Sequence, residues 1–339
     1  MLNGNVPEQF TASGDKEAEM LLKNVLSEIG ETLSGSGLCV CLGGSYGRGD
    51  GGVRQDRENG ILYNDLDFFV FARKRSAGAD LQLKMIAGKY EKELKVDVDF
   101  SRIMSVADMK KNAARLMMQE LKRGYRLVCG EDLLAEYLPE FPAEEIPFSE
   151  ACRLLLNRGM GLLLAGEKMS RNPGDTDFIL RNINKAILGM CDALLIAQKN
   201  YKWKMGERLT AIRSMNLPEE LKQLYSMAVE FKRSPHREPD QDMDLLWSDV
   251  REMFRKCMRE ICGESYTELY LCCKGSGETS LKNLIKYCIR LRRIPAADWR
   301  KFTMPAVAAL LPELDGALKK MPEEQICDSK LYQQWLIFN

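Results

Sequence analysis

The hydrophobic pattern of the chain changes once, near Pro142 and Pro147. Before these prolines, short apolar or alternating segments are separated by glycine-rich turns, which is typical of strands mixed with helices. After them, apolar residues recur at helical spacing over long stretches, with few strand signals. We therefore expect an α+β domain over residues 1–146, with a short mixed sheet flanked by helices, followed by an all-α helical bundle over residues 147–339. A proline-containing loop at 234–241 is where this bundle would divide into two sub-bundles.

Local periodicity also predicts the individual elements. In the first domain, helices are expected over about 15–35, 79–94 and 105–124, and strands over about 38–42, 62–71, 95–101 and 125–128. In the second region, helices are expected over about 149–169, 176–199, 203–213, 217–232, 241–263, 265–274, 278–291 and 303–320. Asp175 follows Pro173–Gly174 and is expected to be a helix N-cap.

Charge and cysteine usage narrow the class of protein. Lys plus Arg and Asp plus Glu both number 49, whereas proteins that hold long nucleic acids usually carry a basic excess. The chain has one histidine and no CxxC pair among its 11 cysteines, so we expect core thiols rather than a zinc site. The N-terminal segment lacks an apolar signal core, and no apolar run approaches the roughly 18–20 residues that cross a membrane. We expect a cytoplasmic protein with no membrane partner.

A glycine-rich turn, Gly43–Gly44–Ser45–Tyr46–Gly47–Arg48–Gly49, follows the first expected strand. Glycines let the backbone approach an anion closely, so that successive N–H groups can point at phosphate oxygens. Ser45 adds a hydroxyl donor, and Arg48 adds a guanidinium able to bind two oxygens at once. Such a turn is structural about as often as it binds a ligand, so it carries little weight alone.

Two expected strands carry alternating acids, Asp65–Leu66–Asp67 and Val96–Asp97–Val98–Asp99. Residues two apart on a strand project from the same face, so each pair of carboxylates points the same way. Close carboxylates persist where they share a cation or a proton, and Mg²⁺ prefers oxygen ligands. The alternative is an edge whose acids simply face water. The apolar run Phe68–Phe71, directly after the first pair, argues against full exposure.

The ordered set resembles the active-site pattern of the DNA polymerase beta-like nucleotidyltransferase superfamily, which includes antibiotic nucleotidyltransferases, poly(A) and CCA-adding enzymes and minimal bacterial nucleotidyltransferases. The family pattern is Gly-Ser, a basic residue, an acid–apolar–acid strand, and an apolar–acid–apolar segment on a later strand. Residues 38–101 carry the resemblance. The resemblance implies triphosphate binding by Gly44, Ser45, Gly47 and Arg48, and metal-bound catalysis by Asp65, Asp67 and Asp97, with Asp99 as the alternative third ligand.

The activity that the resemblance implies is transfer of a nucleoside monophosphate from a nucleoside triphosphate to a hydroxyl of a small molecule or protein, with two Mg²⁺ ions and release of pyrophosphate. One alternative keeps this chemistry but takes tRNA or another RNA as acceptor. A basic segment over 282–301 favours that partner, although an ordinary charged helix surface explains it equally well. The other alternative is a non-catalytic nucleotide-binding regulator or antitoxin-like protein, which would have no need for three converging acids.

The chain departs from the family pattern in one respect. Gly44 and Asp65 are 21 positions apart, roughly twice the interval expected for the family. The extra residues, 50–64, are either a flap over the nucleotide or a surface insertion without a role in the site.

Overall fold

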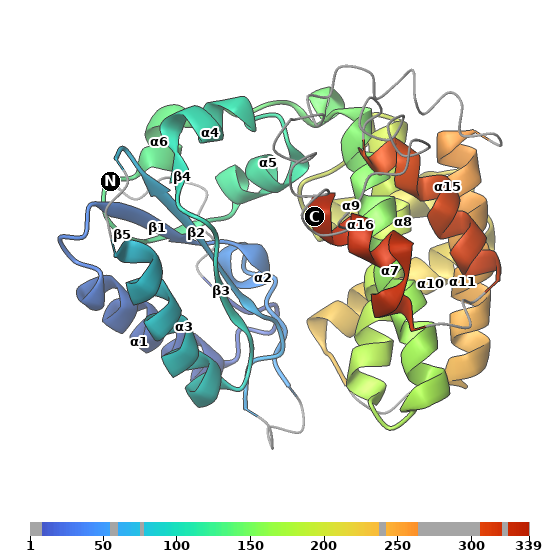
Figure 1. Cartoon of the computed structure of the whole chain (residues 1–339), viewed down its shortest axis with the longest axis horizontal. Coiled ribbons are helices and arrows are strands. Elements are labelled where there is room, and N and C mark those ends of the chain that lie inside the picture. Colours follow the sequence, from blue (N-terminus) through green and yellow to red (C-terminus); the bar gives the residue numbers. More distant parts are fainter. Residues whose placement is uncertain are drawn as a thin grey trace. The chain divides into compact units, whose positions relative to one another are not determined.

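A computed structural model describes residues 9–54, 60–74, 78–236, 242–263, 306–320 and 325–338, and Figure 1 labels its helices and strands. The chain has a mixed α+β architecture with one small mixed sheet and many helices. It separates into two compact units. The first contains Met1–Glu145 and Glu230–His236, and the second contains Ile146–Val229 and Arg237–Asn339.

The sheet belongs to the first unit. Its strands are β1 (Leu38–Leu42), β2 (Leu66–Ala72), β3 (Val98–Phe100), β4 (Met104–Ser105) and β5 (Arg126–Cys129). The strand order is β3-β2-β1-β5, and β4 also pairs with β2. β1 runs antiparallel to β2 and β5, whereas β3 and β4 run parallel to β2. β1 and β2 are therefore the inner strands, and all five residues of β1 are buried.

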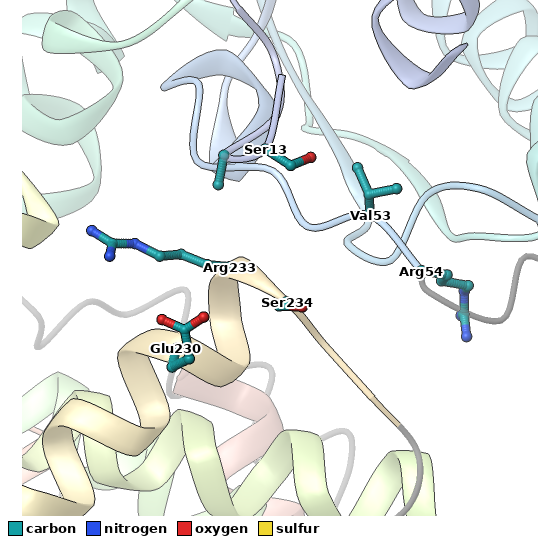
Figure 2. Close-up of a pocket in the computed structure, with 7 residues that line it drawn as sticks. Ser13, Val53, Arg54, Glu230, Arg233 and Ser234 are labelled. Carbon is teal, nitrogen blue, oxygen red and sulfur yellow. The ribbon is translucent and has the colours of Figure 1, made fainter. Parts of the chain in front are cut away.

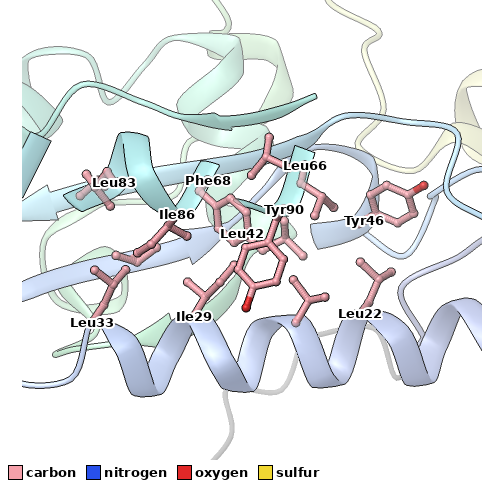
Figure 3. Packing of buried hydrophobic residues seen from close by; sticks show 14 of the residues in the cluster. Leu22, Ile29, Leu33, Leu42, Tyr46, Leu66, Phe68, Leu83, Ile86 and Tyr90 are labelled. Atoms are coloured by element: carbon pink, nitrogen blue, oxygen red, sulfur yellow. The ribbon is translucent and has the colours of Figure 1, made fainter. Parts of the chain in front are cut away.

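Helices cover both faces of the sheet. In the first unit they are α1 (Lys16–Thr32), α2 (Gly44–Gly47), α3 (Ala79–Leu94), α4 (Val106–Lys111), α5 (Leu116–Arg123) and α6 (Leu133–Tyr137), followed by a 3₁₀ turn at Ala143–Glu145. Leu66, Phe68 and Val70 of β2 pack with α1 and α3 in one core cluster. Figure 3 shows this packing. Phe69 and Phe71 pack on the opposite face, against apolar residues of α4, α5 and α6.

In the first unit, the bounds of three elements differ from those that the hydrophobic periodicity predicts. β2 begins at Leu66 rather than at 62, so Asp65 immediately precedes the strand. β3 begins at Val98 because Lys95 adopts a left-handed conformation, with φ of 56°, at the end of α3. The helix expected over 105–124 is two helices, because α4 ends at Lys111 and α5 begins at Leu116. At the end of α4 the Asn112 side-chain amide donates to the Asp108 carbonyl at 2.7 Å, and side-chain bonds of this kind compete with continuation of a helix.

The second unit is helical in its described part. Its helices are α7 (Phe148–Arg171), α8 (Thr176–Ala197), α9 (Met205–Ser214), α10 (Glu219–Arg233), α11 (Met243–Cys262), α15 (Ala306–Lys319) and α16 (Lys330–Phe338), with a 3₁₀ turn at Ile326–Asp328; the last turn of α10 groups with the first unit. α7 packs against α8, α11 and α15. Asp175 caps α8 as predicted, since its carboxylate accepts from the Phe178 N–H at 3.4 Å.

Two expected helices, over 265–274 and 278–291, lie outside the described residues, as does the basic segment over 282–301. α16 and α6 were not predicted from periodicity. Across the described ranges, no helix combines the length and the apolar character needed to span a bilayer.

Candidate functional site

The glycine turn connects the end of β1 directly to the short helix α2. Gly44 has φ of 60°, a left-handed conformation that favours glycine. The Gly43 N–H donates to the Asp67 carbonyl at 2.8 Å, which fastens the start of the turn to β2. The turn and the first acidic pair are therefore neighbours in space, as the sequence pattern requires.

Gly44 lies directly against the carboxylate of Asp67. A Cβ atom placed on Gly44 would be 2.2 Å from Asp67 Oδ2, far inside the 3.4 Å at which ordinary contact begins. Gly47 is equally crowded, because its Cβ would meet the carbonyls of Leu42 and Gly124 at 2.6 and 2.7 Å. The Gly47 N–H donates to the Gly43 carbonyl, so close backbone packing accounts for this glycine without a phosphate contact.

The second acidic pair is placed by the parallel pairing of β3 with β2. Asp67 is the register partner of Asp99, and Leu66 is the partner of Val98. Leu66 and Val98 are buried with α1 and α3, so Asp67 and Asp99 project from the opposite face of the sheet. The Leu66 N–H also donates to the Asp97 carbonyl at 2.9 Å. Asp99, rather than Asp97, is thus the register neighbour of Asp67.

The acids influence one another electrostatically. Partial burial raises the pKa of Asp99, and the negative charges of Asp65, Asp97 and Glu91 raise this pKa further. Carboxylate oxygens are the donors that Mg²⁺ prefers, so the chemistry of this set suits the ion. Within the described part of the chain, however, no three His, Cys, Asp or Glu side chains are grouped closely enough to hold a metal ion together. The carboxylates share one field but do not form a ready-made chelate.

Ser45 and Arg48 lie within the turn, and their side chains differ in the contacts that they make. The Ser45 side chain is half-buried, and its hydroxyl has no intramolecular hydrogen bond within the described residues. Arg48 forms an ion pair with Glu120 of α5 at 3.6 Å, and both side chains are about one-fifth exposed. A phosphate that engaged Arg48 would compete with Glu120 for the guanidinium.

Tyr46 lies in the glycine turn, and the sequence motif did not indicate a role for it. Its side chain is fully buried. Its hydroxyl donates to the Gly52 carbonyl at 2.8 Å and accepts from the N–H groups of Tyr63 and Asn64 at 3.1 and 3.2 Å. Burial raises the pKa of this hydroxyl, which therefore stays protonated. The available signal was a large aromatic residue inside a turn of otherwise small residues.

The long segment between the glycine turn and Asp65 is tied at its base. Residues 55–59 lie outside the described part of the chain. On either side of them, Val53 bridges Leu62 in antiparallel fashion, and the Arg54 N–H donates to the Ile61 carbonyl at 2.8 Å. The two arms thus pair like the base of a hairpin. This arrangement suits either a flap or a surface insertion.

A cavity of about 460 Å³ lies beside this segment in the first unit (Figure 2). It is lined by Ala12, Ser13, Val53, Arg54, Glu230, Arg233 and Ser234. In Figure 2 the side chain of Arg233 extends to the left and that of Arg54 extends downward, so their guanidinium groups lie well apart in the view. The Arg54 Nε atom also donates to the Leu62 carbonyl at 2.9 Å. The two guanidinium groups do not converge on one anion, so this cavity is not a second phosphate cradle.

Two cysteines of β1 and the single histidine of the chain contact other side chains of the protein. Cys39 and Cys41 are buried core thiols, as predicted, with their sulfur atoms 3.8 Å apart. The ring of His236 packs edge-on against Phe231, with the ring centres 5.3 Å apart.

No protein-family model matches the chain, and a search of curated proteins also finds no match. The fold and the site define a mixed α+β unit in which a glycine turn lies beside acids at the starts of two adjacent parallel strands.

Proposed function

We propose that the first unit catalyses metal-dependent transfer of a nucleoside monophosphate from a nucleoside triphosphate to a hydroxyl of a small molecule or protein, releasing pyrophosphate. One observation carries this proposal: the pairing of Asp67 with Asp99, with the Asp67 carboxylate against Gly44. It brings acids from two strands to the turn that suits phosphate binding. The resemblance of residues 38–101 to the nucleotidyltransferase pattern supports the same reaction.

Each residue then has a defined task. Asp65, Asp67 and Asp99 would hold the divalent ions once their side chains turn toward one another, because no three acids of the described residues are grouped closely enough for this as they stand. The register favours Asp99 over Asp97 as the third ligand. Ser45 donates its hydroxyl to a phosphate oxygen, and Arg48 exchanges Glu120 for the leaving pyrophosphate. Mg²⁺ bound there would neutralise the triphosphate charge and lower the pKa of the acceptor hydroxyl.

The electrostatics make nucleotide binding dependent on a divalent ion. Burial and then the negative charges of Asp65 and Asp97 raise the pKa of Asp99, so these carboxylates lie close enough to influence one another. Negative charge gathered in this way would also repel a triphosphate. Without a cation, binding would bring the negative charges of the carboxylates and of the triphosphate together, at a high cost in electrostatic free energy. The nucleotide should therefore bind far more tightly with Mg²⁺ than without it.

The acceptor is proposed from charge balance. The chain carries equal numbers of acidic and basic side chains, which favours a small molecule or a protein over a long RNA.

A labelling experiment tests this function. The full chain is incubated with Mg²⁺, a cell extract and each of the four α-³²P-labelled ribonucleoside triphosphates in turn. We expect one triphosphate to give a labelled product and pyrophosphate with the wild type and with Asp80→Asn, a control on the exposed surface of α3, but not with Asp67→Asn.

The outcomes separate the competing functions. A labelled product that ribonuclease destroys would identify RNA as the acceptor. Absence of pyrophosphate with every triphosphate, together with equal nucleotide affinity with and without Mg²⁺, would refute catalysis and favour a nucleotide-binding regulator.

A further inference from the structure

Tyr46 joins the glycine turn to the chain that leads into Asp65. Its hydroxyl contacts the Gly52 carbonyl and the N–H groups of Tyr63 and Asn64. Asn64 is held a second time, because its side-chain oxygen accepts from the Gly52 N–H at 2.7 Å. One buried hydroxyl thus organises both arms of the segment that precedes Asp65.

The backbone of Asp65 is held on both sides. On one side, the Asn64 N–H is bonded to the Tyr46 hydroxyl at 3.2 Å. On the other, the Leu66 N–H is bonded to the Asp97 carbonyl at 2.9 Å. The second bond belongs to the pairing with the adjacent strand, whereas the first joins the backbone next to Asp65 to the glycine turn. Removing the first bond would loosen this junction without breaking a bond of the sheet ladder.

The Tyr46 hydroxyl has no capacity left for a substrate. A phenol has one donor and two acceptor lone pairs. The donor is used by Gly52, and the two acceptor positions are used by Tyr63 and Asn64. Tyr46 is therefore suited to placing other groups and not to transferring a proton itself.

We propose that Tyr46 is a positioning residue whose hydroxyl sets where the Asp65 carboxylate stands relative to Ser45 and Asp67. The inference rests on the proposed function, because it assigns Asp65 a metal-binding task. The aromatic ring has a separate role in packing: a Cβ on Gly51 would be 2.0 Å from the ring. Tyr46→Phe keeps this packing and removes the hydroxyl alone.

The test compares Tyr46→Phe with Tyr90→Phe. Tyr90 is a buried tyrosine of α3 whose hydroxyl donates to Glu28 at 2.9 Å, so the control removes a hydrogen-bonded hydroxyl from the same unit. Four kinds of measurement are made: kcat and KM for the triphosphate at saturating Mg²⁺, the Mg²⁺ concentration for half-maximal pyrophosphate release, the affinity for Mn²⁺ alone by calorimetry, and amide hydrogen exchange at residues 63–65.

For Tyr46→Phe, we expect kcat to fall by about tenfold to a hundredfold, because small displacements of reacting groups have effects of this size. The Mg²⁺ requirement should rise and Mn²⁺ affinity should fall by about tenfold, while KM for the triphosphate at saturating Mg²⁺ changes less. Exchange at Asn64 should accelerate. Tyr90→Phe should match the wild type in all of these measurements. A role confined to stability would lower the amount of active protein but leave the Mg²⁺ requirement unchanged.

Two failures are distinguishable. If Tyr46→Phe binds Mn²⁺ like the wild type while Asp67→Asn has lost activity, the positioning role is refuted and the proposed function stands. If the wild type neither binds Mn²⁺ nor releases pyrophosphate, both fall. Should circular dichroism show that Tyr46→Phe does not fold, hydrogen exchange of the Asn64 amide in the wild type decides. Because this N–H is bonded to the buried Tyr46 hydroxyl, we expect slow exchange, and rapid exchange would overturn the inference.

Discussion

Gly44→Ala is the change that most directly tests whether the glycine turn and the acids form one site. The new methyl group would stand 2.2 Å from Asp67 Oδ2, and ordinary contact begins at 3.4 Å. The carboxylate must therefore move by about 1.2 Å, the difference between these distances. Rotation of the side chain relieves this closest contact, but Cγ and Cβ of Asp67 would still lie at 3.0 and 3.2 Å, so the turn or the start of β2 must also shift slightly. The movement should disturb the position of the carboxylate more than the stability of the fold.

The backbone adds a separate cost, because Gly44 has φ of 60°. A left-handed conformation costs a non-glycine residue about 1–2 kcal/mol. Gly35 provides the matched control, since its φ is 75° and a Cβ there would meet nothing within 4 Å. Gly35→Ala should suffer the same backbone strain without displacing any side chain.

Thermal unfolding and pyrophosphate release measure the two effects. Gly35→Ala should lose about 1–2 kcal/mol of stability, which corresponds to a few degrees in Tm, and Gly44→Ala should lose at least as much because it also crowds Asp67. Only Gly44→Ala should lose activity, by about a hundredfold, because a reacting group displaced by about 1 Å has an effect of this order. Wild-type kcat in Gly44→Ala, or an equal loss of kcat in Gly35→Ala, would refute the joint site.

Three further predictions follow from the acids and from the helical unit. Asp99→Asn should reduce pyrophosphate release by orders of magnitude and Asp97→Asn by much less, because Asp99 is the register partner of Asp67; equal losses would contradict this assignment. The same Asp99→Asn variant should be as stable as the wild type at pH 7 or up to about 1 kcal/mol more stable. The raised pKa of Asp99 means that the folded state binds more protons than the unfolded state, so stability falls as pH rises from the unfolded pKa through the folded pKa. Urea unfolding should therefore show the gain at pH 7 and its disappearance below the unfolded pKa, near pH 3; a gain of the same size at both pH values would disprove the electrostatic cause. In the second unit, Arg208 is 5% exposed and pairs with Asp192 at 3.2 Å, so Arg208→Met should cost about 3–5 kcal/mol by urea unfolding. Arg213→Met, at an exposed position of the same helix, should cost less than about 1 kcal/mol, and similar costs for both variants would show that the buried pair is not responsible.

Local patterns were sufficient where burial follows directly from spacing along the chain. α1 buries Leu22, Val25 and Ile29 on one face, and these are among the residues whose periodicity predicts the helix. The N-cap of α8 was predictable for the same reason, because Asp175 binds a backbone group only three residues away. Such features need no information from distant parts of the chain.

The boundaries of the acidic strands required tertiary contacts. Periodicity extended β2 back to residue 62, but Tyr46 accepts hydrogen bonds from the N–H groups of Tyr63 and Asn64. These groups are then unavailable to a sheet ladder, and β2 starts at Leu66. Nothing in residues 62–65 themselves indicates that a hydroxyl 17 positions earlier would take a donor from this segment.

The sequence by itself determined that Asp65 and Asp67 lie on the same side of one extended segment, and that Asp97 and Asp99 lie on the same side of a second one. The reason is that alternation of side chains is a property of the local backbone. Only the tertiary structure decided that the two segments are neighbours and that Asp99 stands opposite Asp67. That register depends on burying Leu66 with Val98 and on stacking Phe68 against Phe100, whose ring centres are 4.6 Å apart. A shift by two residues would keep every side chain on its face and still exchange Asp99 for Asp97, so long-range packing, and not alternation, selects the acid beside Asp67.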